Sequence, residues 1–210
     1  MIDTNALYLF IVANIFLALA PGPDNIFVLT QGITKGFKAA FITTLGFTSG
    51  VVIHTSAAAF GITVIFQTSE LAFNIVKYVG AIYLIYLAYQ AYKYRNEPLD
   101  LNEKNGTSTL KKLYIKAFFM NVLNPKVSIF FLAFLPQFVN PVNGSVTMQM
   151  ITLGIIFMIV TIVVFGAIGY AGNILSIKLR QNPKVVTYMN TLTSFVLLGL
   201  GLKLALTTQR

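Results

Sequence analysis

The chain has 210 residues, of which 56% are hydrophobic and only 10% are charged, and its mean hydropathy is +0.76. Soluble domains usually carry about 25% charged residues, and a chain of this length cannot bury so much apolar surface inside a water-exposed globule. The formal net charge of +9 does not indicate nucleic-acid binding, because the basic residues fall in short gaps between long apolar runs. The composition predicts an all-α integral membrane protein without a separate soluble domain.

Six apolar runs are long enough to cross a bilayer, for which a helix needs about 20 apolar residues. The predicted spans are 5–30, 38–66, 71–92, 113–137, 148–172 and 186–206. The first run lacks the positively charged start of a signal peptide, so we expect it to be retained. The six spans predict one transmembrane domain over 1–210, with three spans in 1–92, a polar loop at 93–112 and three spans in 113–210.

The basic residues are concentrated in alternate loops. Eleven of the 15 Lys and Arg residues lie in or beside segments 31–37, 93–112 and 173–185, namely Lys35, Lys38, Lys93, Arg95, Lys104, Lys111, Lys112, Lys116, Lys178, Arg180 and Lys184. Lys77 is assigned to the opposite side, and Lys126 lies within a span. Basic loops stay in the cytoplasm, so this pattern predicts three cytoplasmic loops and both termini outside.

The first span contains the break sequence Ala20-Pro21-Gly22-Pro23-Asp24-Asn25. Pro21 and Pro23 each remove an N–H and clash with the preceding turn, so a regular helix cannot continue through them. Carbonyls freed in lipid must find other donors or line a wet cavity. Asp24 costs about 2.5–3.5 kcal/mol at a helix centre, a cost that usually accompanies a function. Counting along the span places Asp24 nearer the cytoplasm than the midplane, so tilt or re-entry would be needed to centre it.

The second span carries the single histidine of the chain, His54. It is either a proton relay or a buried imidazole that bonds to a neighbouring helix. The glycine pairs Gly46/Gly50 and Gly166/Gly169 are interpreted as sites of close helix packing. The tyrosines of the third span are interpreted as an interfacial belt.

The fourth span contains a second break, Asn121-Val122-Leu123-Asn124-Pro125-Lys126. Pro125 interrupts the helix, two amides flank it, and Lys126 follows with aromatic residues after it. Taken alone, either break has an alternative interpretation as a proline kink with a snorkelling side chain.

The two breaks lie in corresponding spans of two three-helix halves. Halves with an odd number of spans insert with opposite topology, and inverted repeats with broken helices that face each other are a recurrent transporter plan. Asp24 then offers a partner for an ammonium group or a proton. Lys126, together with the N–H groups at the start of a half-helix, offers a partner for a carboxylate. The amides of Asn25, Asn121 and Asn124 are further candidates for substrate or ion binding. The alternative is a salt bridge between Asp24 and Lys126 that substrate or a proton opens.

Both breaks also resemble signatures of the LysE/RhtB family of bacterial amino-acid exporters. The first is Ala20-Pro21-Gly22-Pro23-Asp24-Asn25 followed by Gly32-Ile33-Thr34-Lys35-Gly36, and the second runs from Ala117 through Asn124-Pro125-Lys126 to Phe138. Val127 stands where alanine is common in the family. The resemblance implies an exporter of amino acids or related metabolites in the bacterial inner membrane, driven by the proton-motive force. It leaves the substrate open.

Two other classes compete with a transporter. A passive channel for small polar solutes would need a continuous polar lining, whereas the polar residues here are few and clustered. An enzyme or redox carrier would need more reactive groups than a chain with no cysteine and one histidine supplies. We therefore expect no enzyme activity, no metal and no cofactor. The expected partners are an amino acid, protons and the lipid bilayer, and the oligomeric state stays open.

Overall fold

The computed structural model describes residues 2–20, 22–62, 70–96, 109–174 and 183–206, and within these ranges the regular structure is helical. The elements in chain order are α1 (Thr4–Leu19), α2 (Pro23–Lys35), α3 (Phe37–Ser56), the π-helical turn η1 (Ala57–Ile62), α5 (Glu70–Lys93), α6 (Leu110–Val122), α7 (Pro125–Ile129), the π-helical turn η2 (Phe130–Phe134), the 3₁₀ turns η3 (Leu135–Phe138) and η4 (Pro141–Asn143), α8 (Val146–Ile174) and α10 (Pro183–Leu206).

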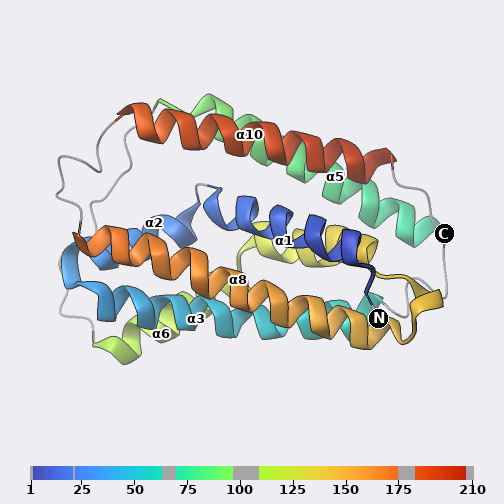
Figure 1. Cartoon of the computed structure of the whole chain (residues 1–210), viewed down its shortest axis with the longest axis horizontal. Helices are drawn as coiled ribbons and strands as arrows, with labels where there is room; N and C mark the ends of the chain where they lie inside the picture. The colour runs from blue at the N-terminus through green and yellow to red at the C-terminus, as the bar shows by residue number, and fades with distance from the viewer. Residues whose placement is uncertain (1, 21, 63–69, 97–108, 175–182, 207–210) are drawn as a thin grey trace.

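When α1 with α2 and α6 with α7 are each taken as one bent segment, successive segments run in alternating directions along one bundle (Figure 1). The α2–α3 turn, the end of α5, the starts of α6 and α10 and the end of α8 lie at one end of the bundle. The described basic loop residues, such as Lys35, Lys93 and Lys111, are on these segments. Lys104, Lys178 and Arg180 lie outside the described residues. Alternate loops therefore gather most of the described basic residues at one end, while the start of α1 and the end of α10 lie at the other.

Helix starts and stops follow from local chemistry. The Asp3 carboxylate accepts hydrogen bonds from the backbone N–H groups of Asn5 and Ala6 at the start of α1, and Thr109 caps α6 through the N–H of Lys112. Gly36 separates α2 from α3 with a φ of 84°, a backbone angle that residues other than glycine rarely adopt. The predicted turn at 31–37 is therefore too long, because Gly36 alone reverses the chain and α2 continues to Lys35.

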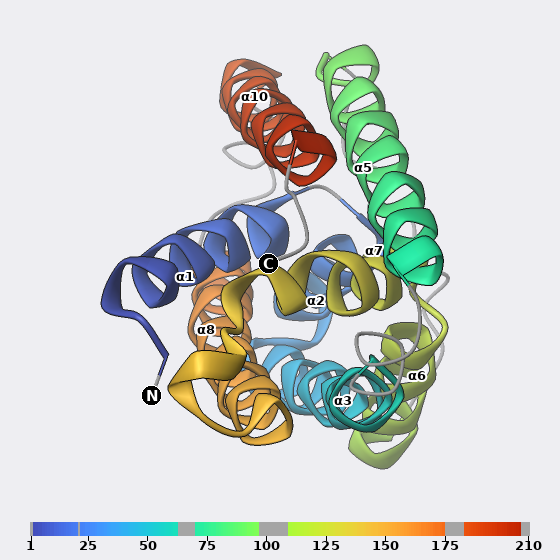
Figure 2. The same cartoon turned by 90° about the vertical axis from the view of Figure 1, so that its right-hand side faces the viewer.

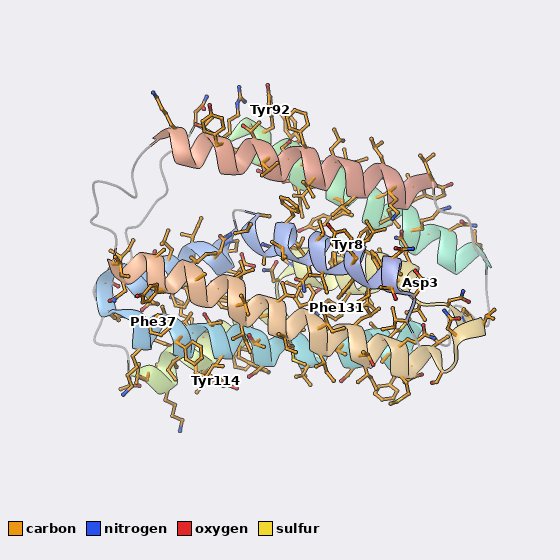
Figure 3. The ribbon with its side chains drawn as sticks, in the orientation of Figure 1. Asp3, Tyr8, Phe37, Tyr92, Tyr114 and Phe131 are labelled. Carbon is orange, nitrogen blue, oxygen red and sulfur yellow. The ribbon has the colours of Figure 1, made fainter. Side chains whose placement is uncertain are left out.

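The interior is built from aromatic and small residues. Phe10, Phe130, Phe131, Phe134 and Phe157 are buried and their rings contact one another in tilted or edge-to-face pairs. Figure 3 shows Phe131 within the bundle and Tyr92 on its outer surface. Many large apolar side chains also point outward, as expected where the surrounding solvent is lipid.

Helices α5 and α10 pack against each other and stand on one side of the bundle, as the end view shows (Figure 2). Lys77 of α5 is buried, with 7% of its surface exposed, and its Nζ lies 4.4 Å from the centre of the Tyr78 ring. Lys77 lies about two turns into α5, which begins at Glu70, and its assignment to the outer side stays a prediction.

The glycine predictions hold in part. A Cβ on Gly46 would lie 2.4 Å from the carbonyl oxygen of Tyr114, one on Gly50 2.6 Å from Oδ1 of Asn121, and one on Gly169 2.6 Å from Cβ of Ala40. These three positions allow close helix packing, as predicted. A Cβ on Gly166 would meet nothing within 4 Å, because this residue lies on a less crowded side of α8.

Two helical stretches, Phe37–Gly61 and Val146–Ile174, are each long and apolar enough to cross a membrane. Two bent pairs of helices are also long and apolar enough to cross a membrane when each pair is taken as one span. These are α1 with α2, at 63°, and Leu110–Val122 with Pro125–Phe138, at 47°. The prediction that the first and fourth spans are broken at prolines is confirmed. The structure supports up to four spans by length and composition within the described residues, so a count of six remains a prediction.

A candidate transport site between two broken helices

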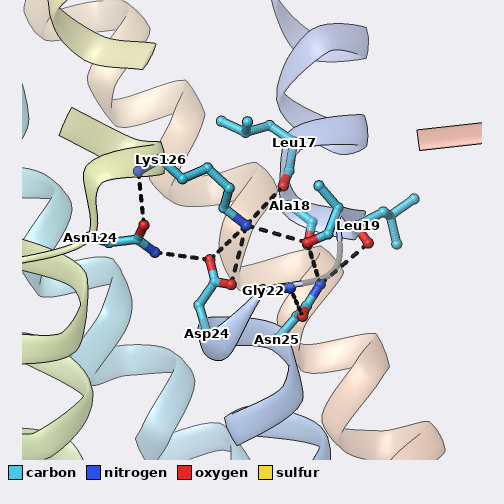
Figure 4. Close-up of polar contacts among 9 residues, drawn as sticks. Leu17, Ala18, Leu19, Gly22, Asp24, Asn25, Asn124 and Lys126 are labelled. Atoms are coloured by element: carbon cyan, nitrogen blue, oxygen red, sulfur yellow. Dashed lines mark hydrogen bonds and ion pairs between the residues drawn. The ribbon is translucent and has the colours of Figure 1, made fainter. Parts of the chain in front are cut away.

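Asn25 holds the first break together. Its Oδ1 accepts a hydrogen bond from the N–H of Gly22 at 3.0 Å, which caps the start of α2. Its Nδ2 donates toward the last carbonyls of α1, at 2.7 Å from Ala20, 3.3 Å from Ala18 and 3.3 Å from Leu19. The Leu19 carbonyl has no helical donor, because that donor would be the missing N–H of Pro23. One amide therefore satisfies polar groups on both sides of the break (Figure 4).

Lys126 satisfies the remaining carbonyls of this break from another span. Its Nζ lies 3.4 Å from the carbonyl oxygen of Leu17 and 3.3 Å from that of Ala20. The Leu17 carbonyl would pair with residue 21 in a continuous helix, and residue 21 is a proline. Pro21 itself lies outside the described residues. The ammonium group therefore sits at the carboxyl end of α1, where the helix dipole favours a positive charge.

The second break separates α6 from α7 and places Lys126. The side chain of Asn124 accepts a hydrogen bond from the N–H of Lys126 at 3.0 Å, so Asn124 caps α7. Pro125 occupies the first position of α7, where its missing N–H costs nothing within that helix. Its fixed backbone and the Asn124 cap turn the chain so that Lys126 points toward the first break (Figure 4).

Asp24 and Lys126 form an ion pair between the two breaks. The Lys126 Nζ lies 3.1 Å from Oδ1 of Asp24 and 3.0 Å from Oδ2. Asp24 is 3% exposed and Lys126 6% exposed, and Nδ2 of Asn124 lies 3.5 Å from the Asp24 carboxylate. Of the arrangements left open by the sequence, the structure shows the direct salt bridge. Asp24 is also in the first turn of α2, where the helix dipole favours a negative charge.

Gly22 leaves room for this pair. A Cβ at this position would lie 2.7 Å from Oδ1 of Asp24 and 3.1 Å from Nζ of Lys126. The backbone of Gly22 is extended, so space and not backbone conformation requires glycine here. A side chain would displace one or both charges.

The first break, between α1 and α2, lies beside the middle of α8. Nδ2 of Asn14, before the break, donates to the carbonyl of Phe157 at 3.4 Å, and Gly32, after it, packs against Gly169. The break between them is therefore level with residues between Phe157 and Gly169 of a helix that runs from Val146 to Ile174. Figure 1 shows the same position, part way along α3 and α8. The bend and the extension of α2 to Lys35 account for Asp24 lying deeper than counting suggests.

His54 and Asn121 meet away from the charges. The His54 Nε2 lies 3.0 Å from the backbone carbonyl oxygen of Asn121, and both residues are buried. Since a carbonyl only accepts, Nε2 must carry the proton of this bond. Oδ1 of Asn121 has no hydrogen-bond partner among the described residues.

Two buried polar residues were missing from the sequence prediction. Asn14 of α1 is fully buried and its Oδ1 has no partner among the described residues, and the same holds for the Oγ1 of Thr161 on α8. Both are polar residues inside predicted spans, so the rule that singled out Asp24 would also have found them. Among the described residues, no cluster of three or more His, Cys, Asp or Glu side chains is arranged to hold a metal ion.

Two broken apolar helices that meet at a buried ion pair are the architecture of helical membrane transporters. The chain matches the LysE type translocator family over residues 15–208, and it therefore belongs to this family, which is one of transporters and not of enzymes.

Curated relatives cover most of the chain. It is 28% identical over 210 residues to an uncharacterized membrane protein, YrhP, of Bacillus subtilis, which covers 96% of this chain and 99% of the relative. It is 32% identical over 164 residues to a homoserine/homoserine lactone efflux protein of Salmonella typhimurium, with 78% of each chain covered. A membrane protein of Vibrio cholerae is 28% identical over 204 residues, 97% of this chain and 98% of the relative. No solved structure matches the chain.

Proposed function

We propose that this protein exports a small amino acid or a closely related metabolite across the bacterial inner membrane in exchange for protons. The observation that carries the proposal is the buried Asp24–Lys126 ion pair between two helix breaks. A relative that is 32% identical is named for the efflux of homoserine and homoserine lactone, which supports a substrate of this size and chemistry.

The ion pair suits a zwitterionic substrate. A buried ion pair is costly to form and much costlier to leave half paired, so each charge must exchange one partner for another. The ammonium group of an amino acid would replace Lys126 at the Asp24 carboxylate, and the carboxylate of the same molecule would replace Asp24 at the Lys126 ammonium. In this exchange of partners both charges stay paired, and the net charge of the site does not change when a zwitterion binds.

Proton exchange follows from the same carboxylate. Asp24 can hold a proton or pair with the substrate ammonium, but not both at once. If the transporter reorients only with Asp24 neutralised in one of these ways, outward movement of substrate is coupled to inward movement of a proton. The carbonyls of Leu17 and Ala20 keep Lys126 satisfied while Asp24 is protonated.

We further propose six spans as two inverted three-helix halves, 1–92 and 113–210, joined by a cytoplasmic loop at 93–112, with both termini outside. The packing supports this plan, because α3 contacts α8, α5 contacts α10, and α2 meets α7 through Asp24 and Lys126. Each span thus meets its counterpart in the other half. Because the chain has no cysteine, single cysteines introduced near residue 2 and at Lys111 would report their sides by thiol labelling.

Transport by the purified protein in proteoliposomes tests the proposal. We expect labelled homoserine to accumulate against its gradient when a pH gradient of the right sign is imposed, and not in protein-free vesicles. A collapse of the pH gradient should abolish accumulation but leave exchange of labelled for unlabelled substrate. Flux that follows the solute gradient alone would instead identify a channel.

Two substrates, homoserine and homoserine lactone, can distinguish the role of Lys126 from that of Asp24. Homoserine lactone carries the ammonium group of homoserine but no free carboxylate. Replacement of Lys126 by Met should therefore reduce homoserine transport more than lactone transport. Equal losses would argue against Lys126 as the carboxylate partner.

A further inference from the structure

The second break leaves one carbonyl without its helical donor. In a continuous helix the carbonyl of Asn121 would accept from the N–H four residues later, and that residue is Pro125. The Asn124 N–H turns back to this carbonyl at 2.8 Å and occupies one of its two acceptor positions. An under-satisfied carbonyl buried at this depth is costly, because no water or lipid group can replace the lost donor.

His54 supplies a second donor to the Asn121 carbonyl from a different span. Its Nε2 lies 3.0 Å from the Asn121 oxygen, and His54 is 6% exposed. His54 is in the last turn of α3, directly before the π-helical turn η1, and its ring faces that of Phe131 in η2 at 6.0 Å between centroids. The imidazole therefore lies where the break of the fourth span meets the end of the regular part of the second.

The packing around this bond holds the end of α6 against α3. Gly46 and Gly50 let α6 approach α3 closely, and α3 and α6 contact each other along their length. The His54–Asn121 bond is at the end of this contact, immediately before the chain turns at Asn124. His54 therefore anchors the end of α6 to α3. The orientation of α7, and with it the position of Lys126, depends on that end.

We propose that His54 is a positioning residue for the transport site. It donates a second hydrogen bond, beside that of the Asn124 N–H, to the carbonyl that lacks the N–H of residue 125, and this bond fixes the break so that Lys126 meets Asp24. The transport test of this inference rests on the proposed function. The role itself requires an N–H at the position of Nε2 and no change in the protonation of His54.

Three substitutions separate this role from a proton relay. The Nε2 of glutamine follows the same number of bonds from Cα as the Nε2 of histidine, whereas the amide of asparagine is one carbon shorter. His54→Gln should keep most of the wild-type kcat/KM for homoserine export, and His54→Asn and His54→Leu should each lower it about fivefold, the equivalent of one lost buried hydrogen bond. The pH dependence of transport by His54→Gln should match that of the wild type.

Other results would overturn the proposal. A proton relay predicts that Gln, Asn and Leu variants lose gradient-driven transport equally and that the pH profile changes. If His54 only fills space, the His54→Leu variant should transport as well as the His54→Gln variant.

A spectroscopic measurement decides the bond without transport or substitution. His54 is the only histidine, so a protein purified without a histidine tag and labelled with ¹⁵N-histidine gives one imidazole to observe by NMR. We expect the neutral form with the proton on Nε2, and a proton on Nδ1 would refute the inference. If the wild-type protein shows no amino-acid flux, the proposed function fails, while the NMR result and the relative thermal stabilities of the Gln and Asn variants still decide the role of His54.

Discussion

The two helix breaks face the same problem and solve it with different groups. In the first, the carbonyls stranded before the prolines are bound by Asn25 and by the charged Nζ of Lys126. In the second, the Asn121 carbonyl is bound by the backbone N–H of Asn124 and by the imidazole of His54. The first break thus depends on a charge that, in the proposed cycle, exchanges partners, and the second on a bond that can persist. This difference assigns movement to the α1–α2 break and anchoring to the α6–α7 break.

The largest effect should come from separating the ion pair. Asp24→Asn and Lys126→Met each leave a buried charge unpaired, which typically costs about 3–5 kcal/mol of folding stability. The double variant carries neither charge and should regain most of the lost stability. Thermal unfolding in detergent measures this, and a double variant as unstable as the sum of the two single variants would show that the charges are not coupled.

Loss of the Asn25 side chain should come next. Asn25→Ala removes the acceptor for Gly22 and the donor for the last carbonyls of α1, and we expect a loss of about 2 kcal/mol or more, since each buried group left unpaired costs about 1–3 kcal/mol. Asn25→Gln is the control, because it keeps both an acceptor and a donor on a side chain one carbon longer, and it should lose less stability than the alanine variant. If the alanine variant unfolds like the wild type, Asn25 does not hold the first break.

Gly22→Ala tests the space beside the ion pair. The new Cβ would lie within 2.7 Å of the Asp24 carboxylate, so the charges must shift, at a cost of about 1–3 kcal/mol for overpacking. We expect transport to fall more than stability, because the pair is displaced and not removed. Gly166→Ala is the control, since its Cβ meets nothing within 4 Å. Equal transport by both variants would contradict the crowded geometry.

The smallest effect should come from the cap of α7. Asn124→Ala removes the acceptor for the Lys126 N–H and should cost about 1 kcal/mol, the usual value for a helix N-cap. Asn124→Ser keeps a capping oxygen and should be close to neutral in the same unfolding assay. A loss as large as that at Asn25 would show that the second break is no better anchored than the first.

The sequence predicted the positions of both breaks, because prolines and charges in apolar runs conflict directly with a helix in lipid. It also named Asp24 and Lys126 and gave their mutual pairing as one of two alternatives, because the direction of a long side chain depends on tertiary packing. Substrate binding by Asn25 and Asn124 stays a prediction, and the capping of the two breaks by their amides is a role that the sequence did not indicate. The π-helical turns η1 and η2 left no signal, because spans that face both protein and lipid are apolar on every side.

The central claim is that Asp24, held between the two breaks by Lys126, couples the substrate to the proton. The most direct test is transport of labelled homoserine by Asp24→Asn in proteoliposomes, with Lys111→Ala as a control in which an exposed lysine is lost. The account predicts that Asp24→Asn inserts but shows no accumulation driven by a pH gradient, while Lys111→Ala transports like the wild type. Unchanged gradient-driven accumulation by a correctly folded Asp24→Asn protein would contradict it.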